Sequence, residues 1–368
     1  MKKIGSEKNA AVNRRSFLKT GMLAGSAATV GAVLAGSSKP AFAQGRLTEG
    51  DIAILRFLAT AELIESDLWI QYAELGGLTS GQPIEVNPSQ TLNGYQTALS
   101  NLDGDGPQYI TSNTNDEISH AAFLNAYLEL HGAEPVNLDR FHTLQGSTAT
   151  GSSNTPRLTN LMNLTVDTSW FTRYRSTQNP DFGATFPQAV TITNRSAIPV
   201  NDADLNGTAA HLQVIANIAA FHFGYIEQGG SSLYATMAQK ASSPEVLQII
   251  LGIGGDEIAH FLEWVDFAGN GVQGPVAPVT DGGLTFANFF DPLNPAIQPS
   301  LIFPVPCEFI NPNLPHCAVI RPLQDKFAGA VATIASFTAD GLFIGQTPQF
   351  FQFVNQLAQA ADAAFREF

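Results

Sequence analysis

Asp116-Glu117-Ile118-Ser119-His120 and Asp256-Glu257-Ile258-Ala259-His260 are near-identical pentads, 140 residues apart in a chain of 368 residues. In a helix, residues three positions apart lie on one face, so the Glu and His of each pentad can bind one metal ion. Carboxylate and imidazole together suit iron, manganese or zinc, and two such pairs indicate two metal ions. The alternative is a Glu–His contact on a solvated face. Chance gives about 0.3 such spacings at this composition, so the repeated pentad favours a metal site.

A first helix is predicted over residues 48–75, with Thr48 as N-cap and two glycines at its end. Apolar residues recur along it at helical spacing, and Glu62 and Glu65 fall within that buried stripe. A buried carboxylate is costly unless an ion offsets its desolvation. We therefore expect one of the two to bind metal, with Glu62 favoured, while a carboxylate that turns to the solvated edge is the alternative.

Three more long helices are predicted, over residues 107–131, 208–240 and 244–268, the last with Ser243 as its N-cap. Glu227 lies at the edge of the buried stripe of the third, and the glycines at 229 and 230 predict a weak or bent point after it. The second and third helices are separated by a long polar connection, residues 133–206, which is typical of a bundle with one crossover.

Some features of these regions have more than one interpretation. The segment 103–106 resembles part of a calcium loop, but Thr114 stands where the last acidic ligand belongs, which favours a turn. His211 and His222 share one helix face, and we favour two separately satisfied or exposed histidines over a second metal pair. The connection contains a strand-like run, residues 189–193. Its aromatic residues are expected to pin it to the helices, with a substrate entrance as the alternative: Trp170, Phe171, Tyr174, Phe182 and Phe186.

The region after Asn270 differs in composition, because closely spaced prolines there forbid a helix and predict an extended strap. Two helices are predicted beyond it, over residues 323–339 and 348–368, and they either cover the bundle or form a dimer contact. Only two cysteines occur, Cys307 and Cys317. They form a disulfide in an oxidising compartment or remain two buried thiols. No Cys-x-x-Cys pair is present, which excludes a rubredoxin-type iron centre.

Residues 1–43 have the pattern of a twin-arginine signal peptide. A motif containing Arg14 and Arg15 precedes a short apolar run, residues 21–36, and an Ala-x-Ala cleavage site at 41–43. We expect export to the periplasm or the extracellular space, with an uncleaved anchor as the alternative. The chain carries a net charge of −14, which becomes −20 when residues 1–43, with seven Lys/Arg and one Glu, are removed. Such a surface repels nucleic acid and anionic membranes, so neither a nucleic-acid partner nor stable membrane insertion is expected.

The order Glu62, Glu117-x-x-His120, long connection, Glu227, Glu257-x-x-His260 resembles the ferritin-like, di-iron carboxylate superfamily. Within it, the closest resemblance is to exported or desiccation-related ferritin-like domain proteins, because a Gly-and-Tyr stretch, residues 228–234, follows Glu227. The resemblance covers residues 48–270. It implies an all-α fold: a ferritin-like four-helix bundle over residues 44–270 with one long crossover between helices 2 and 3. The Pro-rich and helical extension, residues 271–368, lies outside it and argues against a ferritin-type cage, although a homo-oligomer remains open.

The same resemblance implies roles for six residues: Glu62 and Glu227 as terminal ligands, Glu117 and Glu257 as bridging ligands, and His120 and His260 as one nitrogen ligand per metal. It implies two metal ions, iron first and manganese as the alternative, at a centre that reacts with oxygen or peroxide. Phe123, Phe261 and Trp264 are expected to line a pocket for such a small oxidant. A ferroxidase, peroxidase or catalase-like enzyme, a metal-sequestering protein and a structural stress protein all fit, because fold analogy does not choose among functions.

Overall fold

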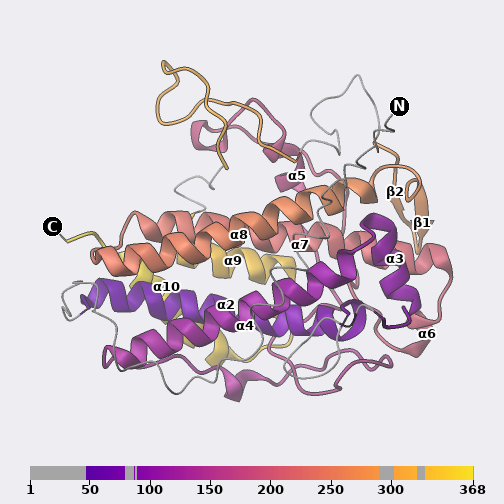
Figure 1. Cartoon of the computed structure of the whole chain (residues 1–368), viewed down its shortest axis with the longest axis horizontal. Coiled ribbons are helices and arrows are strands. Elements are labelled where there is room, and N and C mark those ends of the chain that lie inside the picture. The colour runs from indigo at the N-terminus through magenta and orange to yellow at the C-terminus, as the bar shows by residue number, and fades with distance from the viewer. Residues whose placement is uncertain (1–46, 79–86, 88, 290–301, 321–327, 368) are drawn as a thin grey trace, which may run out of the picture. The chain divides into compact units, whose positions relative to one another are not determined.

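Four long helices lie side by side in the computed structural model, which describes residues 47–78, 87, 89–289, 302–320 and 328–367 (Figure 1). They are α2 (Glu49–Gly76), α4 (Gly106–Leu130), α7 (Ala209–Ala238) and α8 (Pro244–Gly271). α2 packs chiefly against α4, and α7 packs chiefly against α8. The predicted all-α class is confirmed. The predicted signal peptide lies outside the described residues.

Side-chain caps begin three of these helices where the sequence predicts. The hydroxyl oxygen of Thr48 accepts a hydrogen bond from the Asp51 N–H, and Thr208 and Ser243 cap α7 and α8 in the same way. The far ends differ slightly from the prediction. α8 continues past residue 268 to Gly271, where the Asn270 side chain donates to the carbonyl oxygen of Leu102 and holds the last turn against its neighbour. α7 runs without a break through the two glycines that predicted a weak point.

The segments between the long helices are short elements joined by turns. α3 (Gly94–Leu102) packs against α7, and the turn that follows it occupies the segment that resembles a calcium loop. The connection between α4 and α7 contains η1 (Asp139–Phe141), α5 (Ser169–Tyr174), η2 (Pro180–Phe182) and α6 (Asp202–Leu205). The strand prediction for residues 189–193 is wrong, because that run forms no ladder and only the isolated bridge Leu164↔Arg195 lies near it.

Aromatic residues of α5 pin this connection to the long helices, as predicted. Trp170, Phe171 and Tyr174 are buried, and the Trp170 indole N–H donates to the carbonyl oxygen of Phe221 on α7. Two of the predicted residues are exceptions, because 41% of the Phe182 surface is exposed and Phe186 is only half-buried. The anchor is therefore α5 rather than the whole aromatic set.

The C-terminal region begins with a hairpin that the prolines concealed. β1 (Val279–Asp281) pairs with β2 (Leu284–Phe286) through Gly282 and Gly283, whose positive φ angles of 52° and 79° suit a two-residue hairpin turn. α9 (Ala330–Asp340) starts later than residue 323, behind Gly329 at φ 110°, and α10 (Pro348–Ala363) ends before residue 368.

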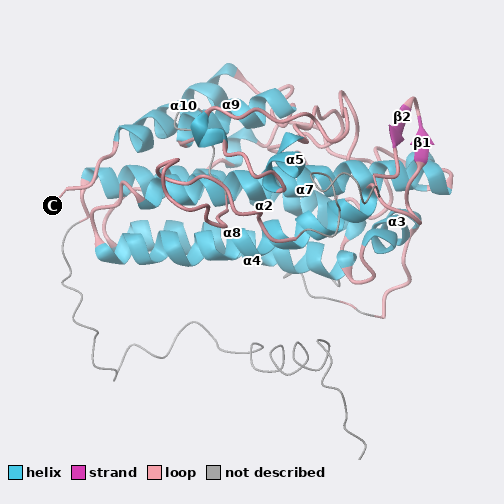
Figure 2. Cartoon of the chain, turned by 90° about the horizontal axis from the view of Figure 1, so that it is seen from above, coloured by secondary structure: helices cyan, strands magenta, loops and turns pink. Residues whose placement is uncertain are grey.

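The two C-terminal helices cover one side of the long helices. α10 packs on α2, and α9 packs on α10. Figure 2 shows α9 and α10 on one side of α2 and α7, with α4 and α8 on the other side. The face formed by α4 and α8, which carry the two pentads, is therefore left uncovered by this pair of helices. None of the helices in the described part of the chain is both long enough and apolar enough to cross a membrane.

Candidate metal centre

Each of the four long helices contributes to one buried cluster of carboxylates and imidazoles. α2 and α7 supply one Glu each, and α4 and α8 each supply a Glu and a His from their pentads. The six residues are those singled out from the sequence: Glu62, Glu117, His120, Glu227, Glu257 and His260. The four Glu have no exposed surface, and the two His expose 8% and 9%.

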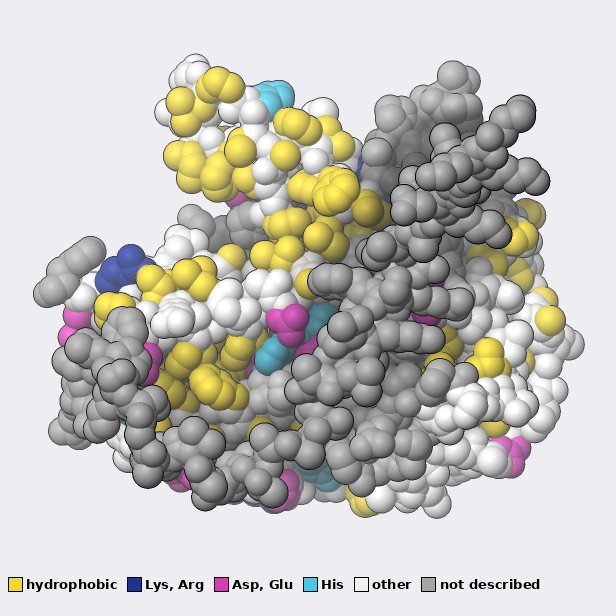
Figure 3. Space-filling model, in the orientation of Figure 1, with side chains coloured by type: hydrophobic (Ala, Val, Ile, Leu, Met, Phe, Trp, Pro, Cys, Tyr) yellow, Lys and Arg dark blue, Asp and Glu magenta, His cyan; other side chains and the backbone are white. Residues whose placement is uncertain are grey.

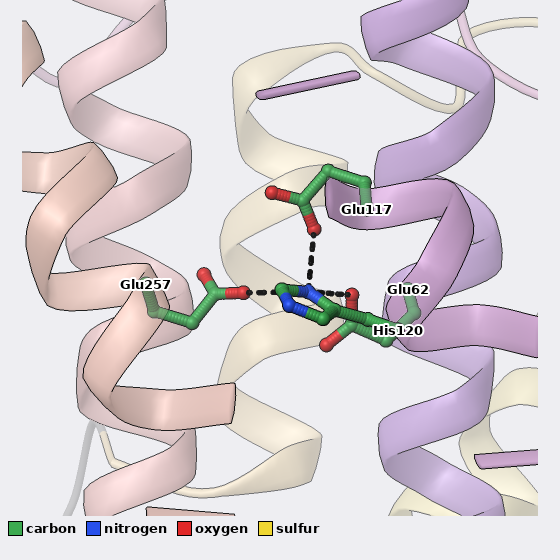
Figure 4. Close-up of side chains that lie close together, drawn as sticks. All are labelled: Glu62, Glu117, His120 and Glu257. Carbon is green, nitrogen blue, oxygen red and sulfur yellow. Dashed lines mark ion pairs between the residues drawn. The ribbon is translucent and has the colours of Figure 1, made fainter. Parts of the chain in front are cut away.

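One half of the cluster surrounds the His120 ring. Its Nδ1 lies 3.3 Å from Glu62 Oε2, 3.5 Å from Glu117 Oε2 and 3.8 Å from Glu257 Oε1. Figure 4 shows the three carboxylates pointing toward this ring from three different helices. One potential ligand atom from each of the four residues lies within 4.8 Å of the others, so the group can hold a metal ion.

The other half of the cluster surrounds His260 in the same manner. Its Nδ1 lies 3.1 Å from Glu117 Oε1 and 3.5 Å from Glu227 Oε2. Glu117, Glu227, Glu257 and His260 form a second group whose ligand atoms lie within 4.8 Å of one another. The two groups share Glu117 and Glu257, while each has a Glu and a His of its own.

A glycine on α7 makes room for one of the shared carboxylates. A Cβ atom at Gly230 would lie 2.1 Å from Glu257 Oε2, far closer than any normal contact. At the preceding Gly229, an added Cβ would meet nothing within 4 Å. The close approach of α7 to the Glu257 carboxylate therefore requires glycine at position 230 and not at 229.

Aspartates from the pentads connect the two halves at the outer edge of the cluster. Asp256 Oδ2 lies 3.2 Å from His120 Nε2, and Asp116 Oδ2 lies 3.4 Å from His260 Nε2. Each pentad therefore supplies an acidic partner to the histidine of the other pentad, which orients the imidazole so that Nδ1 faces inward. The role of these aspartates was not predicted, although both pentads begin with Asp.

Two further side chains, Asn113 and Tyr234, bind the carboxylates, and neither was predicted from the sequence. Asn113 Nδ2 donates to Glu117 Oε1 at 2.8 Å and to Glu227 Oε1 at 3.2 Å, and its own oxygen accepts from the Trp264 indole N–H at 2.8 Å. The Tyr234 hydroxyl donates to Glu62 Oε1. Asn113 lies one helical turn before Glu117, which is the only sign of its role in the sequence.

Glu65 is also buried, with 3% exposed, but it belongs to neither ligand group. Burial raises its pKa well above the ordinary value, and the nearby carboxylate of Glu117 adds to this shift. The structure thus places Glu62 among the potential ligands and Glu65 beside them.

Burial and charged neighbours shift the pKa values of the cluster carboxylates in opposite directions. Burial raises the pKa of Glu62 to about 8, and it raises the pKa of Glu257 well above the usual range. Burial also acts to raise the pKa of Glu117, but the close contacts with the two histidines outweigh it and lower the pKa to about 2. Burial disfavours a charged His120, yet contacts with Asp256, Glu117 and Glu62 raise its pKa to about 12. Without a bound cation, bound protons must offset the repulsion among these carboxylates.

Buried polar atoms without a hydrogen-bond partner indicate whether the cluster is suited to bind a metal. Among the described residues, seven buried atoms of the cluster have no hydrogen-bond partner: Glu62 Oε2, Glu117 Oε2, His120 Nδ1, Glu227 Oε2, both Glu257 oxygens and His260 Nδ1. The contacts of 3.1–3.8 Å to the two Nδ1 atoms are within ion-pair distance without forming aligned hydrogen bonds. All of these atoms are metal-ligating types, and they converge on two points, so the residues fit a pair of metal ions.

The cluster reaches the surface between α4 and α8. The outer aspartates expose 48% (Asp116) and 43% (Asp256) of their side chains. In Figure 3, acidic and histidine side chains gather near the middle of the visible face, next to hydrophobic ones. The imidazole edges of His120 and His260 are therefore the part of the six-residue cluster that lies nearest to solvent.

The predicted aromatic pocket is only partly formed. Phe123 is 52% exposed, and its ring stacks on that of Tyr127, one turn further along α4. Phe261 and Trp264 are buried: the Phe261 ring packs edge-on against Trp170 and Tyr174, and Trp264 binds Asn113.

His211 and His222 do not form a second metal pair. His211 Nδ1 lies 2.7 Å from Asp281 Oδ2 on the hairpin. His222 is buried, with Nδ1 2.7 Å from the Tyr72 hydroxyl and Nε2 2.9 Å from Asp340 Oδ2. Each histidine is thus satisfied separately, as favoured from the sequence.

Comparisons of the chain with protein-family models, with curated proteins and with solved structures find no match. The case for a function therefore depends on the residues of the cluster.

Proposed function

We propose that this protein is an exported, ferritin-like di-metal protein whose centre reacts with oxygen or peroxide. The observation that carries the proposal is the pair of buried four-residue groups that share Glu117 and Glu257. Two shared carboxylates plus one Glu and one His on each side are the ligand set of a di-metal carboxylate centre. Export remains a prediction from residues 1–43.

In this proposal, Glu62 and His120 would hold one ion, Glu227 and His260 would hold the other, and Glu117 and Glu257 would be shared between them. Bound iron, or manganese as the alternative, would supply the electrons that an oxidant accepts. Asn113 and Tyr234 fix the carboxylates by hydrogen bonds, and Asp116 and Asp256 orient the imidazoles. These contacts keep the ligands in place while protons leave them on metal binding.

Access favours a small oxidant over a bulky organic substrate. The carboxylates are fully buried, and only the edges of His120 and His260 approach the surface. Trp264 is buried and lies beside the cluster, where its indole N–H donates to Asn113. An oxidant as small as oxygen or hydrogen peroxide can pass such an edge, whereas a larger substrate would have to displace packed helices.

The test is to load the full-length protein with ferrous iron without oxygen, admit oxygen or peroxide, and follow the absorbance of the oxidised centre. We expect wild type to react at least tenfold faster than free ferrous ion, and the His120→Ala, His260→Ala double variant to react like free ion. His211→Ala is the matched control, because His211 also contacts two aspartates but lies outside the cluster. Equal rates for all proteins would refute the redox function and leave only metal storage or a structural role.

A further inference from the structure

The two cysteines of the chain lie directly opposite each other. Cys307 and Cys317 form an isolated antiparallel bridge, in which the Cys307 N–H donates to the Cys317 carbonyl oxygen at 3.1 Å and the Cys317 N–H donates to the Cys307 carbonyl oxygen at 2.9 Å. Residues that exchange both hydrogen bonds have Cα atoms about 5.5 Å apart and side chains on the same face. Disulfides typically join Cα atoms about 4.4–6.8 Å apart.

The two cysteines of the bridge differ in burial. Cys307 is buried, and Asn179 Nδ2 lies 3.6 Å from its sulfur while donating to the Glu308 carbonyl oxygen at 2.6 Å. Cys317 is exposed. The alternative of two buried thiols is therefore wrong for Cys317. The segment before the bridge is tied to α5, where the Tyr174 hydroxyl donates to the Ile302 carbonyl oxygen at 2.7 Å.

We propose that Cys307 and Cys317 form a disulfide that closes the loop 307–317. The oxidant is a second disulfide, of a small molecule or a protein. The exposed Cys317 thiolate attacks one sulfur of this oxidant, which forms a mixed disulfide and releases one thiolate. The Cys307 thiolate then attacks the Cys317 sulfur and releases the second thiolate. The two cysteines lose two electrons and two protons, and the oxidant is reduced to two thiols.

The cross-link acts on a segment with little packing of its own. Between the cysteines, Ile310 is 76% exposed and Leu314 is 52% exposed. Ile310 also has a φ of 64°, a conformation that β-branched residues rarely adopt. Two backbone hydrogen bonds alone are a weak closure for such a loop, whereas a covalent bond removes the open conformations. The disulfide thus holds the apolar loop against the Asn179 side chain.

The experiment uses the full chain incubated with oxidised glutathione, then unfolded, alkylated and measured by mass spectrometry. We expect a monomer without alkylated thiols, a proteolytic fragment in which Cys307 is linked to Cys317, and two alkylated thiols after reduction. Reduction should also increase chymotryptic cleavage between residues 307 and 317 at least tenfold. In the Cys307→Ser, Cys317→Ser double variant, that cleavage should be fast under both conditions and the metal content should stay unchanged. Two alkylated thiols, a glutathione adduct on Cys317 that persists at the end of the incubation instead of being displaced by Cys307, or a cross-linked dimer would each overturn the proposal.

Discussion

Helix α2 carries two kinds of buried carboxylate within six positions, and they are satisfied in opposite ways. Asp67 is 6% exposed, and its Oδ2 accepts hydrogen bonds from the N–H groups of Leu158 and Thr159, from the Thr159 hydroxyl and from the Gln71 amide. Glu62 is fully buried and accepts one hydrogen bond, from Tyr234, while its Oε2 has no hydrogen-bond partner among the described residues.

This difference in hydrogen bonding distinguishes Asp67, a structural carboxylate, from Glu62, a carboxylate available to bind a metal ion. The fold can saturate a buried carboxylate, because it does so at Asp67 with groups from a distant loop. At the cluster it instead brings four Glu and two His together and leaves their inner atoms facing one another. A buried charge without partners is costly, so an arrangement of this kind indicates that cations complete it.

Asp67→Ala tests the structural half of this comparison and should have the largest effect. Its loss leaves the buried N–H groups of Leu158 and Thr159 without an acceptor, which costs about 3 kcal/mol of unfolding free energy. Metal content per folded chain should not change. Denaturant unfolding and metal analysis of the same samples measure both quantities, and a variant that lost its metal while keeping wild-type stability would reverse the assignment.

Gly230→Ala tests whether the cluster carboxylates, here Glu257, bind metal. The new methyl group must displace the Glu257 carboxylate, which is the movable partner in the contact, so metal affinity should fall roughly 10- to 100-fold. The helix itself should not suffer, because Ala favours a helix over Gly by up to about 1 kcal/mol. Gly229→Ala is the matched control with open space around its Cβ. Metal titration of both variants should separate them, and equal affinities would show that Glu257 is not a ligand.

The pH dependence of the metal-free protein should show a smaller effect. Burial raises the pKa of Glu62 from 4.5 to about 8, so folded protein keeps a proton that unfolded chain releases. This contribution to stability is present at low pH and is lost as pH rises through 8. The pKa of His120 is raised from 6.5 to about 12, so its contribution also decreases above pH 6.5. Unfolding free energy should therefore fall by on the order of 1 kcal/mol between pH 6.5 and 8.

Denaturant unfolding of the metal-free protein at several pH values measures this slope. Glu62→Gln should make the fall shallower, because the amide cannot release a proton, while the contribution of His120 remains. Glu129→Gln, at an exposed position of α4, should leave it as in wild type. An unfolding free energy that rises with pH in this range would contradict the protonation pattern of the cluster. So would a pH dependence that Glu62→Gln leaves unaltered.

The sequence allowed the helices and the six potential ligands to be predicted because those signals are local. Glu117 and His120, like Glu257 and His260, are three positions apart on one helix, and Glu62 interrupts an apolar stripe. The contacts of Asp116 and Asp256 could not be predicted, because each depends on how α4 and α8 pack. Similarly, the N–H groups that satisfy Asp67 lie about 90 positions away, in the long connection. The hairpin was missed because prolines near Val279 outweighed the Asp-Gly-Gly turn that follows.

The most direct test of the central claim is an anaerobic titration of the full-length, metal-free protein with ferrous or manganous ion. The account predicts two ions per wild-type chain. It also predicts lower occupancy, with a lower melting temperature at the same free metal concentration, when either shared ligand is replaced in Glu117→Ala or Glu257→Ala. Full metal content in both variants, or a wild type that binds no metal, would contradict a di-metal centre built on these two carboxylates.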